Sequence, residues 1–223
     1  MLDKERNIQL ALPSPKKLFT PAVTVIIVLM IVGYALLSYA RGFVLNHLVL
    51  SGAGVIHGKI WQLLTFSFFN DGSLCLVFNG ILLLFVGSSI EREWRTGPFV
   101  VFLLVVSVTC GLLWVIVNLA LGQNYAGLGM SAWGYGLIAA FGMLFYRRLV
   151  LAVLWTVEAQ YVSWFLIGIG IVLGIPQPIT WIWVSGAGVA YIYIKLRQRE
   201  NIGRAKIRRT ASRDRGNDFV DID

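Results

Sequence analysis

The chain has 223 residues, of which 57% are hydrophobic and only 13% are charged, and its mean hydropathy is +0.75. A soluble domain carries about 25% charged residues, so the composition excludes a soluble globular protein and indicates an integral membrane protein. The net charge of +8 lies almost wholly in loops and tails, which favours contact with the membrane surface over nucleic-acid binding. Cys75 and Cys110 lie in apolar stretches, and neither a disulfide framework, a metal site nor a cofactor is predicted.

The first part of the chain predicts one membrane-spanning helix followed by interfacial structure. Residues 1–19 are polar and form a predicted cytoplasmic N-terminal segment. Residues 21–39 are uncharged and long enough to cross a bilayer core of ~30 Å, and too long for the apolar region of a cleaved signal peptide. Residues 41–73 mix aromatic and polar side chains, which predicts short amphipathic helices at the outer face.

Five further apolar stretches complete the predicted membrane domain. They cover residues 74–90, residues 98–121, the helix that Ser131 opens, residues 161–175 and residues 179–194, with an interfacial connection at residues 149–158. The sequence therefore predicts an all-α integral membrane protein, with a six-transmembrane-helix domain over residues 20–195. Residues 196–223 form a predicted basic, disordered cytoplasmic tail.

The basic residues predict the orientation of this domain. With six spans and both termini in the cytoplasm, every Lys and Arg except Arg41 and Lys59 falls on the inner side, as the positive-inside rule expects. No charged residue lies within a predicted span, which argues against a small transporter or channel component.

Small residues surround Ser131, which lies on the outward half of its helix. Gly129, Ala132 and Gly136 allow neighbouring helices to approach closely in a bilayer. We expect Gly134 and Gly136 to contact the last helix, where Gly186 and Gly188 are equally bare. A hydroxyl at the tip of such a helix is also a candidate nucleophile.

Several segments, in order and spacing, together resemble the rhomboid family of intramembrane serine proteases. They are Trp61-Gln62-Leu63-Leu64-Thr65, residues 69–73, Cys75 to Asn79, Gly87 to Glu91 with Gly97 and Phe99, Gly129-Met130-Ser131 with Gly136, and Gly186 in the last helix. The resemblance implies a six-helix rhomboid-like bundle with an amphipathic outer loop, in a bacterial plasma membrane. It also implies that Ser131 occupies the nucleophile position and Asn79 that of an oxyanion donor.

The histidines of the resembled site are missing. Cys75 replaces the family's oxyanion-side histidine, and its general base would fall at Trp183 or Val184. No histidine follows His57, which itself belongs to the outer loop. Because a serine hydroxyl is a weak nucleophile without an adjacent base, the resemblance implies a pseudoprotease.

The favoured function is therefore binding of transmembrane segments of client proteins, for regulation or quality control, without cleavage. The basic tail would attract anionic lipids, and no nucleic acid is expected. An active intramembrane serine endopeptidase, using Ser131 with an unconventional base such as His57, is the alternative. The simplest interpretation of Ser131 and Asn79 alone is that both make hydrogen bonds between helices.

Overall fold

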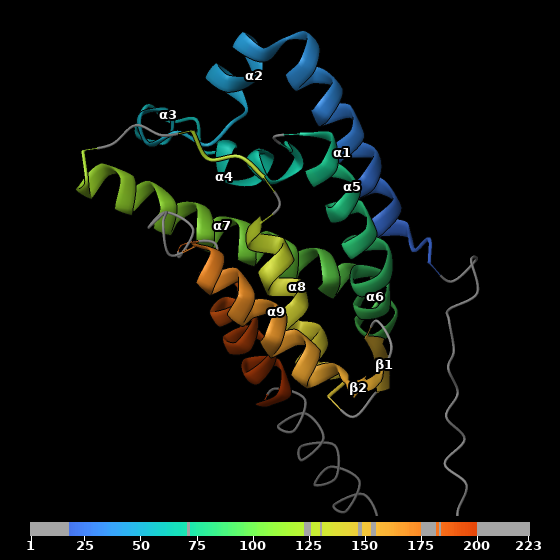
Figure 1. Ribbon diagram of the computed structural model, residues 1–223. Coiled ribbons are helices and arrows are strands. Elements are labelled where there is room, and N and C mark those ends of the chain that lie inside the picture. Colours follow the sequence, from blue (N-terminus) through green and yellow to red (C-terminus); the bar gives the residue numbers. More distant parts are fainter. Residues whose placement is uncertain are drawn as a thin grey trace, which may run out of the picture.

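The computed structural model (Figure 1) describes residues 18–70, 72–122, 126–129, 131–146, 149–152, 155–174, 182 and 184–199. These residues are mainly helical, with one antiparallel hairpin formed by β1 (Leu149–Ala152) and β2 (Trp155–Glu158). The sequence predicted a connection here but no strands. Strands this short, with apolar residues running on without alternation, carry no clear period-2 signal.

Three helices are long and apolar enough to cross a membrane, within the part of the chain that the structure describes. They are α1 (Pro21–Tyr39), the continuous helix Ser73–Trp94, and α7 (Thr96–Ala120). The second consists of α5 (Ser73–Leu82), a π-helical turn η3 (Leu83–Gly87) and α6 (Ser88–Trp94). These three match the first three predicted spans, although the second runs on past residue 90 to Trp94.

The other three predicted spans correspond to shorter helices. They are α8 (Ser131–Leu144), α9 (Ala159–Gly174) and a helix at residues 184–199. With 14 residues, α8 is about 21 Å long, which is less than the ~30 Å core, so six spans stay a prediction. The last helix continues beyond residue 195, where the tail was predicted to begin, and the remaining tail lies outside the described residues.

Glu91 joins the end of α6 to the start of α1. Its carboxylate is buried and accepts hydrogen bonds from the Thr20 hydroxyl, from the backbone N–H groups of Ala22 and Val23 at 3.0 and 3.1 Å, and from the Thr96 hydroxyl at 2.7 Å. The first N–H groups of a helix lack partners within that helix, and the helix dipole favours an anion beside them. A residue predicted to lie at the polar end of a span is therefore a buried cap of another helix.

Charged side chains link helix ends at one end of the bundle. The end of α6 meets the start of α1 through Glu91, and the Arg197 guanidinium of the last helix lies 4.9 Å from the Trp94 ring centroid at the end of α6. The short helices α2 (Arg41–His47), α3 (Gly52–Ile56) and α4 (Gln62–Thr65), with the 3-10 turn η2 (Phe66–Phe68), lie at the opposite end. The predicted short helices over residues 41–73 are confirmed.

Side-chain hydrogen bonds hold the segment with the short helices together. The Trp61 indole donates to the His47 carbonyl at 2.8 Å, and the Thr65 hydroxyl donates to the Leu48 carbonyl at 2.6 Å. A β-bridge between Leu50 and Gly127 then ties this segment to the loop that leads into α8. We call residues 41–70 the short-helix segment; it fixes where α8 begins.

The last helix packs directly on α8 where both lack side chains. A Cβ on Gly186 would overlap the Ala132 carbonyl oxygen, and a Cβ on Gly136 would lie 3.4 Å from the Gly186 carbonyl oxygen. The predicted contact is confirmed for Gly136 and Gly186. It is wrong for the other two glycines: a Cβ on Gly134 would meet a Leu82 methyl group, and a Cβ on Gly188 would meet no atom of another described element within 4 Å.

Candidate functional site

Ser131 lies at the first position of α8, in line with its prediction at the tip of the helix. The chain turns into α8 through Gly129, whose φ of +107° suits glycine. A Cβ on Gly129 would lie 3.8 Å from Ser131 Oγ and 3.9 Å from the Phe69 carbonyl oxygen. The start of α8 therefore meets the end of the short-helix segment. The Ser131 side chain is exposed, and its hydroxyl makes no hydrogen bond to another described residue.

Asn79 is paired with Asn70 rather than held by Ser131. The Asn79 amide donates to Asn70 Oδ1 at 2.6 Å. Asn70 is 1% exposed, and its own Nδ2 has no hydrogen-bond partner among the described residues. Asn70 directly follows Phe69, whose carbonyl oxygen lies close to Gly129 at the start of α8. The Asn70–Asn79 pair therefore lies next to the start of α8. We call the region formed by Asn70, Asn79, Gly129 and Ser131 the serine corner.

Asn70 is part of the resembled segment at residues 69–73, but no functional role was predicted for it. The available signal was an amide directly after the aromatic run at residues 66–69, in a chain whose apolar segments contain few polar side chains. Such a residue needs a partner when buried. Its partner, nine positions away on the next helix, was not identifiable from the sequence.

Neither histidine is built into the serine corner. His57 is exposed at the end of α3, and its Nδ1 lies 2.6 Å from the Ala53 carbonyl oxygen. It borders a cavity of about 320 Å³ with Asn46 and Lys59, and Ser131 is not among the described residues that line it. His47 stacks on Phe43 with ring centroids 4.9 Å apart.

The positions where the resemblance expected other catalytic histidines carry no base in the described structure. Cys75 is an exposed free thiol on α5, one turn before Asn79. Val184 is half-buried and packs against the apolar core, and its neighbour Ser185 donates to the Ile182 carbonyl oxygen at 2.5 Å. Trp183, the alternative position of the lost base, lies outside the described residues.

Gln62, which lies in the resembled segment Trp61 to Thr65, has a structural partner. It is fully buried, and its Oε1 accepts from the Ser51 backbone N–H at 3.2 Å and from the Ser51 hydroxyl at 3.3 Å. The same hydroxyl accepts from the Gly54 N–H and caps α3. Gln62 therefore orders the short-helix segment.

A comparison with known families places the chain. The sequence profile of a family described as eukaryotic integral membrane protein (DUF1751) matches residues 22–217. The chain belongs to this DUF1751 family. The family's description as integral membrane proteins agrees with the long apolar helices of the structure. The expected bacterial plasma membrane is not supported, because the family is described as eukaryotic. No curated protein matches the chain.

One helix beside the serine corner of this DUF1751 protein is barely packed. None of the described residues of α5 is buried, and Leu74, Val77 and Phe78 are 68%, 56% and 63% exposed. The element contacts of α5 include α1 and its own continuation η3. The α5 surface is therefore open to the bilayer or to another apolar helix.

The chemistry available at the serine corner is hydrogen-bond donation. Asn70, Asn79 and Ser131 offer amide and hydroxyl donors, which suit a carbonyl oxygen. The only titratable side chains on the described helices that carry Asn79 and Ser131, α5 and α8, are Cys75 and Tyr135. A donor set of this kind binds a carbonyl group without activating the serine.

Proposed function

We propose that this protein binds transmembrane segments of client proteins at the serine corner and along α5, and does not cleave them. The main observation that supports this proposal is the buried Asn70 Nδ2, which has no hydrogen-bond partner among the described residues. A buried unpaired N–H costs about 1–3 kcal/mol, and the bilayer core supplies no water to satisfy it. In this proposal a bound client displaces part of α5 from Asn70, brings a carbonyl group to the uncovered N–H, and so removes that cost.

The open face of α5 supports the same proposal. Leu74, Val77 and Phe78 present apolar surface next to the helix position that carries Asn79. Transmembrane helices associate by van der Waals packing and by a few hydrogen bonds between helices. We infer a client helix that packs on α5 and exposes a backbone carbonyl at a local break, such as one caused by proline or glycine.

The proposed context is a six-helix rhomboid-like bundle with both termini in the cytoplasm. In this orientation the serine corner lies toward the outer side, near α2 to α4 (Figure 1). Binding without cutting would retain, escort or stabilise a client, which suits regulation or quality control. General-base help is worth about 10²–10⁴ in rate, and the proposal requires that Ser131 receives none.

Site-specific crosslinking tests the binding site. A photoreactive amino acid is placed at Phe78 on α5 or at Ile116 on α7, which are 63% and 60% exposed. The protein is reconstituted into vesicles with a labelled single-span peptide that carries a central Gly-Pro break. We expect crosslinking from position 78 well above that from position 116, and less with an unbroken peptide. Equal crosslinking from both positions would refute the proposed surface.

Asn70→Leu tests the polar part of the site. Losing this donor should weaken peptide crosslinking about tenfold, as expected for a hydrogen bond that is otherwise unsatisfied. Asn118→Leu is the matched control, because Asn118 is equally buried, at 1% exposure, but lies on α7. Its Nδ2 donates to the Trp114 carbonyl oxygen, so the atom that lacks a partner among the described residues is the acceptor Oδ1 and not a donor. An identical loss in both variants would assign the effect to general destabilisation and overturn the assignment of Asn70.

The exposed hydroxyl of Ser131 favours one competing function, an active intramembrane serine endopeptidase. A serine-directed phosphonate should not label the purified protein if the proposal holds, and Ser131→Ala should leave peptide crosslinking unchanged. Labelling or specific proteolysis that disappears in Ser131→Ala would establish the protease instead. His57→Ala would then identify or exclude the unconventional base.

A further inference from the structure

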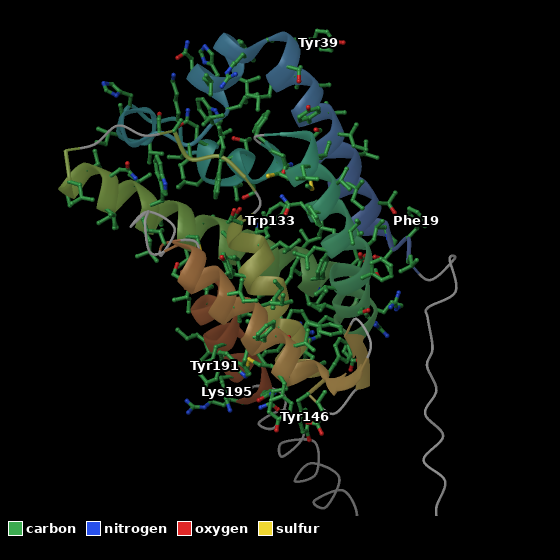
Figure 2. The ribbon with its side chains drawn as sticks, viewed as in Figure 1. Phe19, Tyr39, Trp133, Tyr146, Tyr191 and Lys195 are labelled. Atoms are coloured by element: carbon green, nitrogen blue, oxygen red, sulfur yellow. The ribbon has the colours of Figure 1, made fainter. Side chains whose placement is uncertain are left out.

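A second cavity lies at the opposite end of α8 from Ser131. It has a volume of about 260 Å³ and is enclosed by α8, α9 and the helix at residues 184–199. Tyr146, Tyr191 and Lys195 border it and lie together at this end of the bundle (Figure 2). This cavity shares no lining residue with the serine corner and carries an inference independent of the proposed function.

The lining of this cavity changes from apolar to polar along the helices. Ala139, Ile167 and Ala187 form its deeper part, whereas Gln160, Lys195 and Gln198 lie near the helix ends. Ile167 and Gln160 are separated by about 10 Å along α9, and Ala187 and Lys195 by about 12 Å along the last helix, at 1.5 Å per residue. An occupant must therefore be apolar at one end and polar at the other.

Lys195 supplies a positive charge at the polar end. Its Nζ lies 5.6 Å from the Tyr191 ring centroid, and it forms no ion pair within the described part of the chain. No Asp or Glu is among the described residues that line the cavity. Gln160 and Gln198 add amide donors, so the polar end suits an anion.

These observations fit one occupant. We propose that the cavity binds an anionic phospholipid, with its phosphate at Lys195 and one acyl chain along Ile167 and Ala187. Basic pockets between membrane helices on the cytoplasmic side recognise lipid headgroups in this way. The site differs from the predicted attraction of the basic tail to lipids, because it requires a shaped cavity as well as charge.

Native mass spectrometry of the delipidated full-length protein in detergent tests the site. Dioleoyl phosphatidylserine and dioleoyl phosphatidylcholine are titrated separately, and soluble glycerol phosphate is added as a competitor without acyl chains. We expect phosphatidylserine to bind more tightly than phosphatidylcholine, and glycerol phosphate at equal concentration not to compete. Equal binding of both lipids, or full displacement by glycerol phosphate, would overturn the proposal; the latter would indicate a free-phosphate site.

Charge variants separate the cavity from the tail. Lys195→Ala should weaken phosphatidylserine binding about fivefold, as expected for the loss of one cation at the membrane surface. Lys195→Glu should weaken this binding further, because it also introduces a negative charge. Arg199→Ala is the matched control, because Arg199 is exposed on the same helix and is not among the lining residues. Equal effects of Lys195→Ala and Arg199→Ala would assign binding to diffuse surface charge and refute the cavity.

A variant of the apolar wall completes the test. Ala187→Phe places a large side chain in the deep part of the cavity while leaving Lys195 intact. We expect at least a tenfold loss of phosphatidylserine binding. Undiminished binding by a folded Ala187→Phe protein would show that no acyl chain enters the cavity.

Discussion

The contact between α8 and the last helix allows a sharp prediction about Gly186→Ala. A Cβ at this position would overlap the Ala132 carbonyl oxygen and lie 3.3 Å from the Ala132 carbonyl carbon and 3.5 Å from its Cα. All three neighbours are backbone atoms, so no side-chain rotation relieves the overlap. The two helices must separate.

The size of the effect follows from two opposing terms. Overpacking costs typically about 1–3 kcal/mol, and a rigid backbone neighbour favours the upper part of that range. Replacing glycine by alanine inside a helix contributes roughly 0.5–1 kcal/mol of stability. We therefore expect Gly186→Ala to lower the free energy of unfolding by about 2 kcal/mol.

Gly188→Ala is the internal control for this prediction. Gly188 lies on the same helix, and no described atom of another element lies within 4 Å of the place that an added methyl group would take, so only the helix-propensity gain applies. Unfolding of both variants is followed in mixed detergent micelles by titration with a denaturing detergent. If Gly186→Ala proves as stable as Gly188→Ala, the close contact between Gly186 and α8 is incorrect.

Three further predictions concern polar contacts. Glu91→Ala removes the cap of α1 and should lower the free energy of unfolding by about 3 kcal/mol, measured by the same titration. Glu93 is exposed, so Glu93→Ala should change this free energy little, and equal effects of the two variants would contradict the cap. The hydroxyl oxygens of Ser67 on η2 and Ser107 on α7 lie 2.6 Å apart. A double-mutant cycle of Ser67→Ala and Ser107→Ala should therefore give a coupling energy of ~0.6 kcal/mol, and zero coupling would refute this hydrogen bond. Trp133→Phe loses the indole hydrogen bond to a carbonyl of α7 at 3.0 Å and should cost about 1 kcal/mol, so an unchanged denaturation midpoint would contradict that bond.

Local sequence properties predicted much of the helical structure. The charge-free run at residues 21–39 became α1 with the same bounds, and the mixed run at residues 41–73 became short helices. Hydropathy and length suffice for such predictions, because each helix satisfies its own backbone hydrogen bonds. The sequence also shows directly that no histidine follows His57, so the helix that Ser131 opens and every later segment lack an imidazole.

The partners of polar residues were decided by the tertiary structure. Glu91 caps a helix that begins about seventy positions earlier, and Asn79 bonds Asn70 rather than Ser131. Neither pairing leaves a local pattern in the sequence. Each becomes identifiable only when α1, α5, α6 and the short-helix segment are placed side by side.

The buried faces of the helices were also decided only by tertiary packing. Gly136 and Gly186 pack tightly, whereas Gly188, two positions along the same helix, has an open neighbourhood in the described structure. In a soluble protein a polar stripe would reveal the outward face of each helix. In a bilayer, lipid and protein interior are equally apolar, so hydrophobic periodicity does not distinguish the face that packs from the face that meets lipid.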